Sequence, residues 1–345
     1  MVLSVCALVA LPAIAQAEIP SGPRLTFMEA ADSGFRLISS DPSGGDQRVI
    51  VGGNSKSQLL PFPFSAPSWS GDGTRVTFTG IALSGEKAFL DIYDAAADGT
   101  GVTRLPRTRE GLDPILSPDG RTLAFVRERE RKARQRHQAK VSFRGASIWL
   151  LDVESGAVRQ LTPWRNGLYA FPSSFSPDGS TLAITREHRK VSGQVRVAAV
   201  AQKLDGSGST VLAENAGWPV YSPDGTRLAL ITIGKRRTIG SKGEMTSFSP
   251  TDLAVAAGDG SGLTKLTHTR NLELSPSWDP SGERLAYTLL RVSGSEADVL
   301  GIGDSIMEIN ADGTCRTKVL SVPKASLYGA TWQPGPGREA GPIAC

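Results

Sequence analysis

The 345-residue sequence contains little of what catalytic and metal-binding sites are usually built from. It has three histidines and three cysteines, and His137, His188 and His268 lack the spacing of metal ligands. The G-x-S-x-G motif of many serine hydrolases is missing as well. We therefore expect surface positions for the three histidines, and we expect no catalytic residues, no bound metal and no cofactor.

Helical features are also scarce, because apolar residues seldom recur at the spacing of an amphipathic helix over a long stretch. The chain is instead rich in residues that interrupt regular structure, with 38 glycines and 22 prolines. Frequent turns and short elements follow from this composition. A chain of this length can bury a large core, as one all-β domain or as two smaller ones.

A short hairpin-like phrase recurs along the chain, typified by SFSPDGSTLAIT at residues 174–185. In each copy a large apolar residue comes just before a turn, and an apolar strand follows the turn. Successive copies of this residue are 46 to 59 positions apart. The large apolar residues are Trp69, Leu116, Phe175, Tyr221, Trp278 and, in a degenerate sixth copy, Trp332. Such a column indicates an inner strand that is buried between its neighbours.

The turn residues of the repeat have a structural explanation. Proline fixes φ, aspartate bonds its own local backbone, and glycine adopts the positive φ that a tight reversal requires. We therefore interpret the aspartates of these turns as turn formers rather than as metal ligands or catalytic groups; they are Asp72, Asp119, Asp178 and Asp224. Each unit has a second hairpin further on, with an Asp-Gly or Ser-Gly turn. One unit is thus four strands, named A to D in chain order.

Four-stranded units repeated at this spacing are typical of a β-propeller. Five complete units are followed by a lone A strand that ends near Trp332 and needs three more strands. Residues 24–29, 34–39 and 47–52 have the pattern to supply strands B, C and D. We therefore predict an all-β, six-bladed propeller over residues 23–334, closed by N-terminal strands that pair with the C-terminal strand.

The phrase SPDGxxLAF, followed by a strand and ADGSG, resembles the PD40 repeat of the TolB-like propellers, which are related to WD40 proteins. The resemblance covers residues 23 to 335. Members of this group include periplasmic partners of the Tol–Pal system, propeller domains of prolyl oligopeptidase-type peptidases and many exported proteins of unassigned role. The α/β domain that precedes the propeller in TolB has no counterpart in this sequence, so we do not expect a Tol role.

The first 17 residues have features of a cleaved signal peptide. They carry no charge and end in Ala-Gln-Ala, a small-residue pattern that signal peptidase accepts. Pro12 and the short apolar span argue against the alternative, a transmembrane helix. Residues 18–22 would then form a linker, and residues 335–345 a C-terminal tail. We expect an extracytoplasmic protein, whether periplasmic, secreted or attached to the cell envelope, with no transmembrane span in its mature form.

Removal of the signal peptide leaves two cysteines, Cys315 and Cys345, in a compartment that permits disulfides. In the predicted register, Cys315 lies beside the C–D turn of the fifth unit, on the face where the tail emerges. We predict a disulfide between the two that fastens the tail beside the closure of the ring. Free thiols or an intermolecular disulfide are the alternatives, and otherwise we expect a monomer.

Cations gather at one position of the repeat, the loop between strands B and C. Residues 126–144 contain eight of them against two glutamates, and residues 186–190 and 235–237 are also basic. These loops are predicted to share one face, opposite the aspartate turns, and to attract an anionic partner. The candidate binding residues are Arg127, Arg129, Arg131, Lys132, Arg134, Arg136, Lys140, Arg189, Lys190, Lys235, Arg236 and Arg237. A protein partner or an anionic envelope polymer is expected rather than nucleic acid, and a solvated loop without a partner is the alternative.

Three acidic residues, Asp113, Glu214 and Glu273, come just before or within the predicted inner strands and are candidates for the mouth of the central channel. A carboxylate cluster there can bind a cation or a sugar. We predict that the protein is a non-catalytic binding platform that uses the B–C and D–A loops. Two alternatives stay open: a propeller hydrolase or lyase that uses these carboxylates or His188 and His268, and a secreted accessory protein of structural value only.

Overall fold

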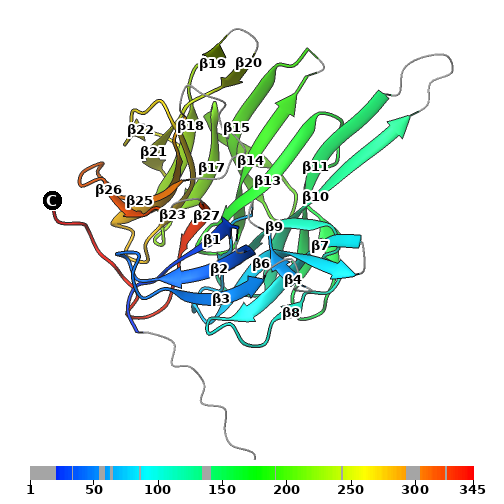
Figure 1. Cartoon of the computed structure of the whole chain (residues 1–345). Coiled ribbons are helices and arrows are strands. Elements are labelled where there is room, and N and C mark those ends of the chain that lie inside the picture. The colour runs from blue at the N-terminus through cyan, green and yellow to red at the C-terminus, as the bar shows by residue number, and fades with distance from the viewer. Residues whose placement is uncertain are drawn as a thin grey trace, which may run out of the picture.

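A computed structural model of the chain describes residues 21–345, apart from residues 33, 54–58, 63–64, 85–86, 134–140, 191, 242–243, 293–303 and 323–324. The signal peptide predicted at residues 1–17 lies outside the described residues. The regular structure of the described part consists of β-strands and contains no helix. It therefore holds no helix long and apolar enough to cross a membrane. The sheets have a propeller-like arrangement (Figure 1).

The two ends of the described chain share one sheet. Strands β1 (Leu25–Ala31), β2 (Gly34–Ser40) and β3 (Arg48–Gly53) lie beside β27 (Ala325–Trp332) in the order β27-β1-β2-β3. Leu25 pairs with Trp332 in the antiparallel register of β1 and β27. The predicted pairing of N-terminal strands with the C-terminal strand is thus present, and strands B, C and D of this sheet fall where the sequence placed them.

The other sheets follow in chain order. Most of their strands correspond to the predicted positions A to D; the exceptions are the short strand at residues 59–61 and a hairpin within residues 237–248. The first sheet holds β4 (Leu59–Pro61), β5 (Ser68–Trp69), β6 (Arg75–Ser84), β7 (Lys87–Ala96) and β8 (Thr103–Arg104). The next strands are β9 (Gly111–Leu116), β10 (Thr122–Ala133), β11 (Val141–Asp152), β12 (Val158–Gln160), β13 (Leu168–Phe175), β14 (Thr181–Arg189), β15 (Val195–Lys203) and β16 (Ser209–Glu214). The last are β17 (Ala216–Tyr221), β18 (Arg227–Ile233), the hairpin β19 (Arg237–Ser241) and β20 (Glu244–Phe248), β21 (Thr251–Ala257), β22 (Thr264–Lys265), β23 (Leu272–Trp278), β24 (Arg284–Leu290), β25 (Ser305–Asn310) and β26 (Thr317–Leu320).

Six separate four-stranded sheets were expected, and the hydrogen bonding of the described strands differs from this in three places. The hairpin β19–β20 forms a separate two-stranded sheet. Strands β9 to β16 form one eight-stranded sheet, because β11 and β13 share a single parallel pair, Ala146 with Tyr169. A Cβ at neighbouring Gly145 would lie 2.5 Å from the Arg165 carbonyl oxygen, so glycine permits this close approach. Elsewhere, β4 and β5 both pair with β6, which makes a five-stranded sheet.

The turn between strands A and B has the geometry that its residues predict. In the fourth copy of the repeat, Oδ1 of Asp224 accepts hydrogen bonds from the Ser222 hydroxyl at 2.6 Å and from the Thr226 backbone N–H at 3.0 Å. Gly225 takes the left-handed conformation, with φ of 73°. The Ser222 hydroxyl and the Thr226 donors lower the pKa of Asp224 to about 2. The carboxylate therefore serves the turn, as the sequence indicated.

Most of the large apolar column of the repeat is buried between neighbouring sheets, whereas Leu116 and Tyr221 are half-buried and line the cavity described below. Trp69, Phe175, Trp278 and Trp332 are buried, and the indole N–H of Trp278 donates to the Val220 carbonyl at 3.0 Å. Each hydrophobic cluster mixes residues of adjacent strand groups; one contains Trp69 of β5 together with residues of β1, β2, β3, β6 and β7. Face-to-face packing of this kind fixes the sheets relative to one another.

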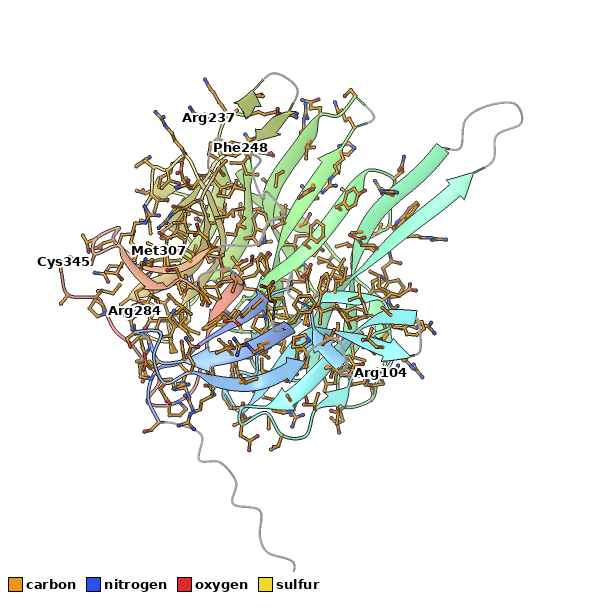
Figure 2. All side chains as sticks on the ribbon, in the orientation of Figure 1. Arg104, Arg237, Phe248, Arg284, Met307 and Cys345 are labelled. Carbon is orange, nitrogen blue, oxygen red and sulfur yellow. A yellow bond between two sulfur atoms is a disulfide. The ribbon has the colours of Figure 1, made fainter. Side chains whose placement is uncertain are left out.

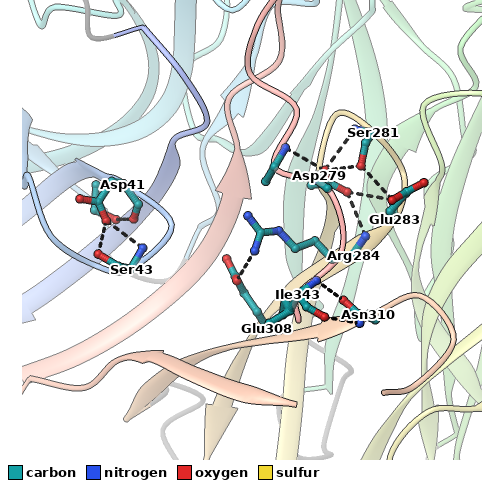
Figure 3. Close-up of polar contacts among 12 residues, drawn as sticks. Asp41, Ser43, Asp279, Ser281, Glu283, Arg284, Glu308, Asn310 and Ile343 are labelled. Carbon is teal, nitrogen blue, oxygen red and sulfur yellow. Dashed lines mark hydrogen bonds and ion pairs between the residues drawn. The ribbon is translucent and has the colours of Figure 1, made fainter. Parts of the chain in front are cut away.

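The C-terminal tail is held to the propeller by a disulfide and by hydrogen bonds. Cys315 and Cys345 form the predicted disulfide, with their Cα atoms 5.2 Å apart (Figure 2 labels Cys345). The backbone of Ile343 also exchanges two hydrogen bonds with the Asn310 side chain, at 2.7 and 3.0 Å. Figure 3 shows this pairing and also the carboxylate of Asp279. This carboxylate accepts hydrogen bonds from the Glu283 backbone N–H in its own turn and from the Ala340 backbone N–H of the tail, the latter at 3.2 Å. The tail is therefore docked on the last complete unit, beside β27.

Candidate functional site

A cavity of about 480 Å³ lies between inner strands of the neighbouring sheets. Its wall includes residues of β5, β9, β13, β17, β23 and β27, which are the A strands of the repeat. Cavities of 300 to 1,000 Å³ are typical of small-molecule sites. The repeat thus places a cavity between its inner strands, and all six of these A strands contribute residues to it.

The A strands carry a β-bulge at corresponding positions. The register of strands A and B shifts beside Asp113 in β9, Trp218 in β17 and Ser275 in β23, and these residues have left-handed φ values of 51°, 49° and 51°. In β27 the equivalent left-handed residue is Gly329, with φ of 66°. A bulge re-aims the side chain that it displaces, and non-glycine residues adopt this conformation at a cost. Asp113, Trp218 and Ser275 all line the cavity.

Asp113 is the sequence-predicted channel residue that the structure does place in the cavity wall. Burial raises its pKa to about 6; a hydrogen bond from Ser65 opposes this rise, and the charge of Glu128 adds to it. Close by, burial raises the pKa of Tyr328 to about 12, and the carboxylate of Asp113 contributes. Glu187 of β14 and Trp218 also line the cavity. Glu187 had no sequence signal, because it belongs to a B strand.

The other two predicted channel residues are not among the residues that line the cavity. Glu273 precedes the bulge in β23, so its side chain faces β21 and is fully buried. It accepts hydrogen bonds from the Leu253 N–H at 2.8 Å, the Thr267 hydroxyl and the Arg316 guanidinium at 3.1 Å. Glu214 is exposed and ends β16, an outer strand that pairs with β15. Their expected place at the channel mouth is therefore corrected.

Several of the predicted basic residues stand on aromatic rings at the B–C ends of the strands. The guanidinium of Arg127 lies 4.8 Å from the centre of the Trp149 ring, and that of Arg129 lies 5.2 Å from Trp164. In β14, Arg189 lies 4.3 Å from the centre of the Tyr169 ring. Arg189 also donates two hydrogen bonds to Oε2 of Glu187, at 2.7 and 2.9 Å. Stacking of this kind orders the guanidinium while its edge keeps free donors.

The remaining basic candidates are distributed as follows. Lys190, Lys235, Arg236 and Arg237 are exposed. Arg131 and Lys132 belong to β10, but their side chains lie outside the described residues, as do Arg134, Arg136 and Lys140 entirely. Figure 1 shows the hairpins β10–β11, β14–β15 and β19–β20 projecting toward the same side, and Figure 2 labels Arg237 at this end. The basic B–C loops of three strand groups thus share one end of the molecule.

Histidine and metal chemistry find little support in the described part of the chain. His188 and His268 are exposed, as expected, while His137 lies outside the described residues. Neither of these two lines the cavity. Among the described residues, no group of three His, Cys, Asp or Glu side chains is arranged to hold a metal ion.

The comparisons with known proteins agree with this architecture. No family model matches the chain. A TolB homologue of Chlorobium luteolum is 29% identical over 160 residues, which are 44% of this chain and 31% of that protein. An uncharacterized peptidase, YuxL of Bacillus subtilis, is 30% identical over 123 residues, which are 34% of this chain and 16% of that protein. The chain therefore matches less than a third of the length of either relative.

Two solved structures cover most of the chain. TolB from Acinetobacter baumannii aligns with a TM-score of 0.61 and 18% identity, over 90% of this chain and 67% of that one. The putative TolB from Agrobacterium tumefaciens aligns with a TM-score of 0.54 and 16% identity, over 90% of this chain and 98% of that one. The molecule is thus a β-propeller of antiparallel units around a central cavity. Its fold resembles that of the two TolB structures, as the turns of the repeat predicted.

Proposed function

We propose that the protein is an exported, non-catalytic binding platform that recognises an anionic partner with the B–C face of a closed, six-bladed propeller. The partner is an acidic protein surface or an anionic envelope polymer. The observation that carries the proposal is the set of arginines held on aromatic rings at one end of neighbouring strands, Arg127, Arg129 and Arg189. The propeller itself, over residues 23–334, positions this face and takes no part in chemistry.

Different observations support the count of six blades and the location outside the cytoplasm. Six strand groups each contribute an A strand to one cavity, and β1 pairs with β27, as a closed ring requires. The disulfide between Cys315 and Cys345 is consistent with an oxidising compartment outside the cytoplasm. The resemblance to TolB, with its periplasmic members, favours the same location.

Conformational entropy and charge both favour binding of an anion at this face. A guanidinium that already lies on a ring loses less freedom when it binds, and its planar edge matches carboxylate, sulfate or phosphate oxygens. Of the three stacked arginines, Arg189 is paired with a carboxylate, while Arg127 donates to the Arg107 carbonyl oxygen. Arg129, Lys190 and the basic residues 235–237 are exposed at the same end. Binding to such a face is long-ranged and screened by salt.

Retention on heparin tests the proposal. We expect the double variant Arg129→Ser and Arg189→Ser to elute at clearly lower salt than the wild type. The matched control is Arg121→Ser with Lys203→Ser, which removes the same charge from exposed residues beside the A–B and C–D turns. Excision of residues 129–141 should lower the elution salt further. If both double variants elute together, net charge alone explains retention and the proposed face is wrong.

An enzyme with a channel-mouth site is the weaker candidate. Of the acids and histidines named for it, Asp113 alone lines the cavity, whereas Glu273 is engaged by three donors elsewhere. The neighbouring carboxylate of Glu187 is paired with Arg189. A binding role for the cavity fits this composition better than acid–base catalysis does.

A further inference from the structure

The cavity wall has a charge character opposite to that of the B–C face. Its described lining contains two acidic residues, Asp113 and Glu187, and no lysine, arginine or histidine. Arg189 engages one oxygen of Glu187. For Asp113, the described residues show no ion pair, and a hydroxyl, that of Ser65, is its hydrogen-bond donor. A mostly buried carboxylate without a cationic partner is costly in a folded protein unless a ligand compensates it.

Aromatic rings from three different A strands, β13, β17 and β27, line the same cavity as this carboxylate. Phe171, Trp218, Tyr221 and Tyr328 are half-buried residues of the cavity wall. The face of an aromatic ring attracts a cation, most of all when water is excluded. Trp218 also has a left-handed backbone conformation, which a residue with a bulky side chain adopts only where the surrounding structure imposes it. Carboxylate and rings together define a site for a positive group with an apolar body.

We propose that the central cavity binds a small organic cation, an amine or quaternary ammonium compound, whose positive group lies at Asp113 and whose hydrocarbon part lies against Trp218, Phe171 and Tyr328. Calcium or magnesium would require several oxygen ligands around one point. The cavity wall instead offers few carboxylates and many rings, which suits a large, weakly hydrated cation. The volume of about 480 Å³ accommodates a molecule of this size.

Benzyltrimethylammonium is a suitable probe, because it combines a quaternary ammonium group with one ring. We expect calorimetry on the full-length protein to give a Kd below about 1 mM. Benzyl alcohol and benzoate, neutral and negative compounds of similar ring size, should bind at least about tenfold more weakly. Tighter binding of benzoate, or equal binding of all three, would overturn the proposal.

Asp113→Asn keeps the shape of the side chain and removes its charge. We expect it to weaken binding of the ammonium probe roughly tenfold or more, whereas Glu154→Gln, at an exposed turn residue, leaves it unchanged. Glu187→Gln, with its own fold checked by circular dichroism, serves as a second variant and should weaken binding several-fold. Unchanged affinity in both cavity variants would refute the site.

The same experiments separate this site from the proposed B–C face. Asp113→Asn should leave heparin elution as in the wild type, so either proposal can fail while the other stands. The expected occupant is a free small cation. If N-acetyl-lysinamide bound tenfold more tightly than benzyltrimethylammonium, a lysine side chain of another protein would be the occupant and the present assignment would be wrong.

Discussion

The disulfide between Cys315 and Cys345 should make a large contribution to the stability of the protein. The two residues are 30 positions apart, and closing a loop of that length in the unfolded chain stabilises the native state by about 3.6 kcal/mol at 25 °C. For 345 residues, the entropy of unfolding is about 0.7 kcal/mol per kelvin. Replacing both cysteines by serine should therefore lower the Tm by about 5 °C.

Both cysteines are replaced together, because a single change leaves a thiol free for intermolecular exchange. The two hydrogen bonds between Ile343 and Asn310 remain in the variant, so the tail can keep its native position. The loss of stability then comes from the unfolded chain, which gains conformational entropy without the disulfide. Thermal unfolding followed by circular dichroism measures the shift. Dithiothreitol should destabilise the wild type by a similar amount and leave the serine variant unaffected.

Two results would refute this reasoning. A shift below about 1 °C in the double variant would show that the tail detaches at little cost before the propeller unfolds. Two free thiols in non-reducing mass spectrometry of the native protein would show that the disulfide does not form.

Two further predictions concern buried carboxylates. The pKa of Asp113 is raised from 3.8 to about 6, so between these pH values the native state binds more protons than the unfolded state. The contribution of Asp113 to stability therefore falls as the pH rises from about 4 to about 6. Asp113→Asn should therefore stabilise the protein by up to about 3 kcal/mol at pH 7.5 and by almost nothing at pH 3.5, as urea unfolding would measure. Equal effects at both pH values would contradict the assignment. Glu273→Ala removes a buried acceptor from the Leu253 N–H, the Thr267 hydroxyl and Arg316, so we expect a loss of about 3 kcal/mol in the same assay, and a loss below 1 kcal/mol would contradict it.

Local chemistry made much of this fold predictable. The turn at Asp224 and Gly225 depends on residues within five positions of one another, and its carboxylate and left-handed glycine are as expected. The spacing of Trp69, Phe175 and Trp278 likewise predicted the buried inner strands. The pairing of Leu25 with Trp332 followed from counting strands, because the lone last A strand needed partners.

The candidate site was only partly predictable, because side-chain direction in a strand depends on register. Asp113 and Glu273 both belong to A strands, yet one lines the cavity and the other faces β21. They differ in their position relative to the bulge, whose place is set by pairing with strand B. Glu187 reaches the cavity from a B strand, which no pattern in its own segment indicates.

The sequence by itself determined the repeat, the strand order within a unit and the end of the molecule that carries the basic loops, because turn residues act over a few positions and recur in register. Only the tertiary structure decided which side chains meet in the central cavity, which arginines stack on rings, and that β11 and β13 join two units into one sheet. These features depend on bulges and on contacts between residues of different units, and such contacts exist only once the sheets have packed together.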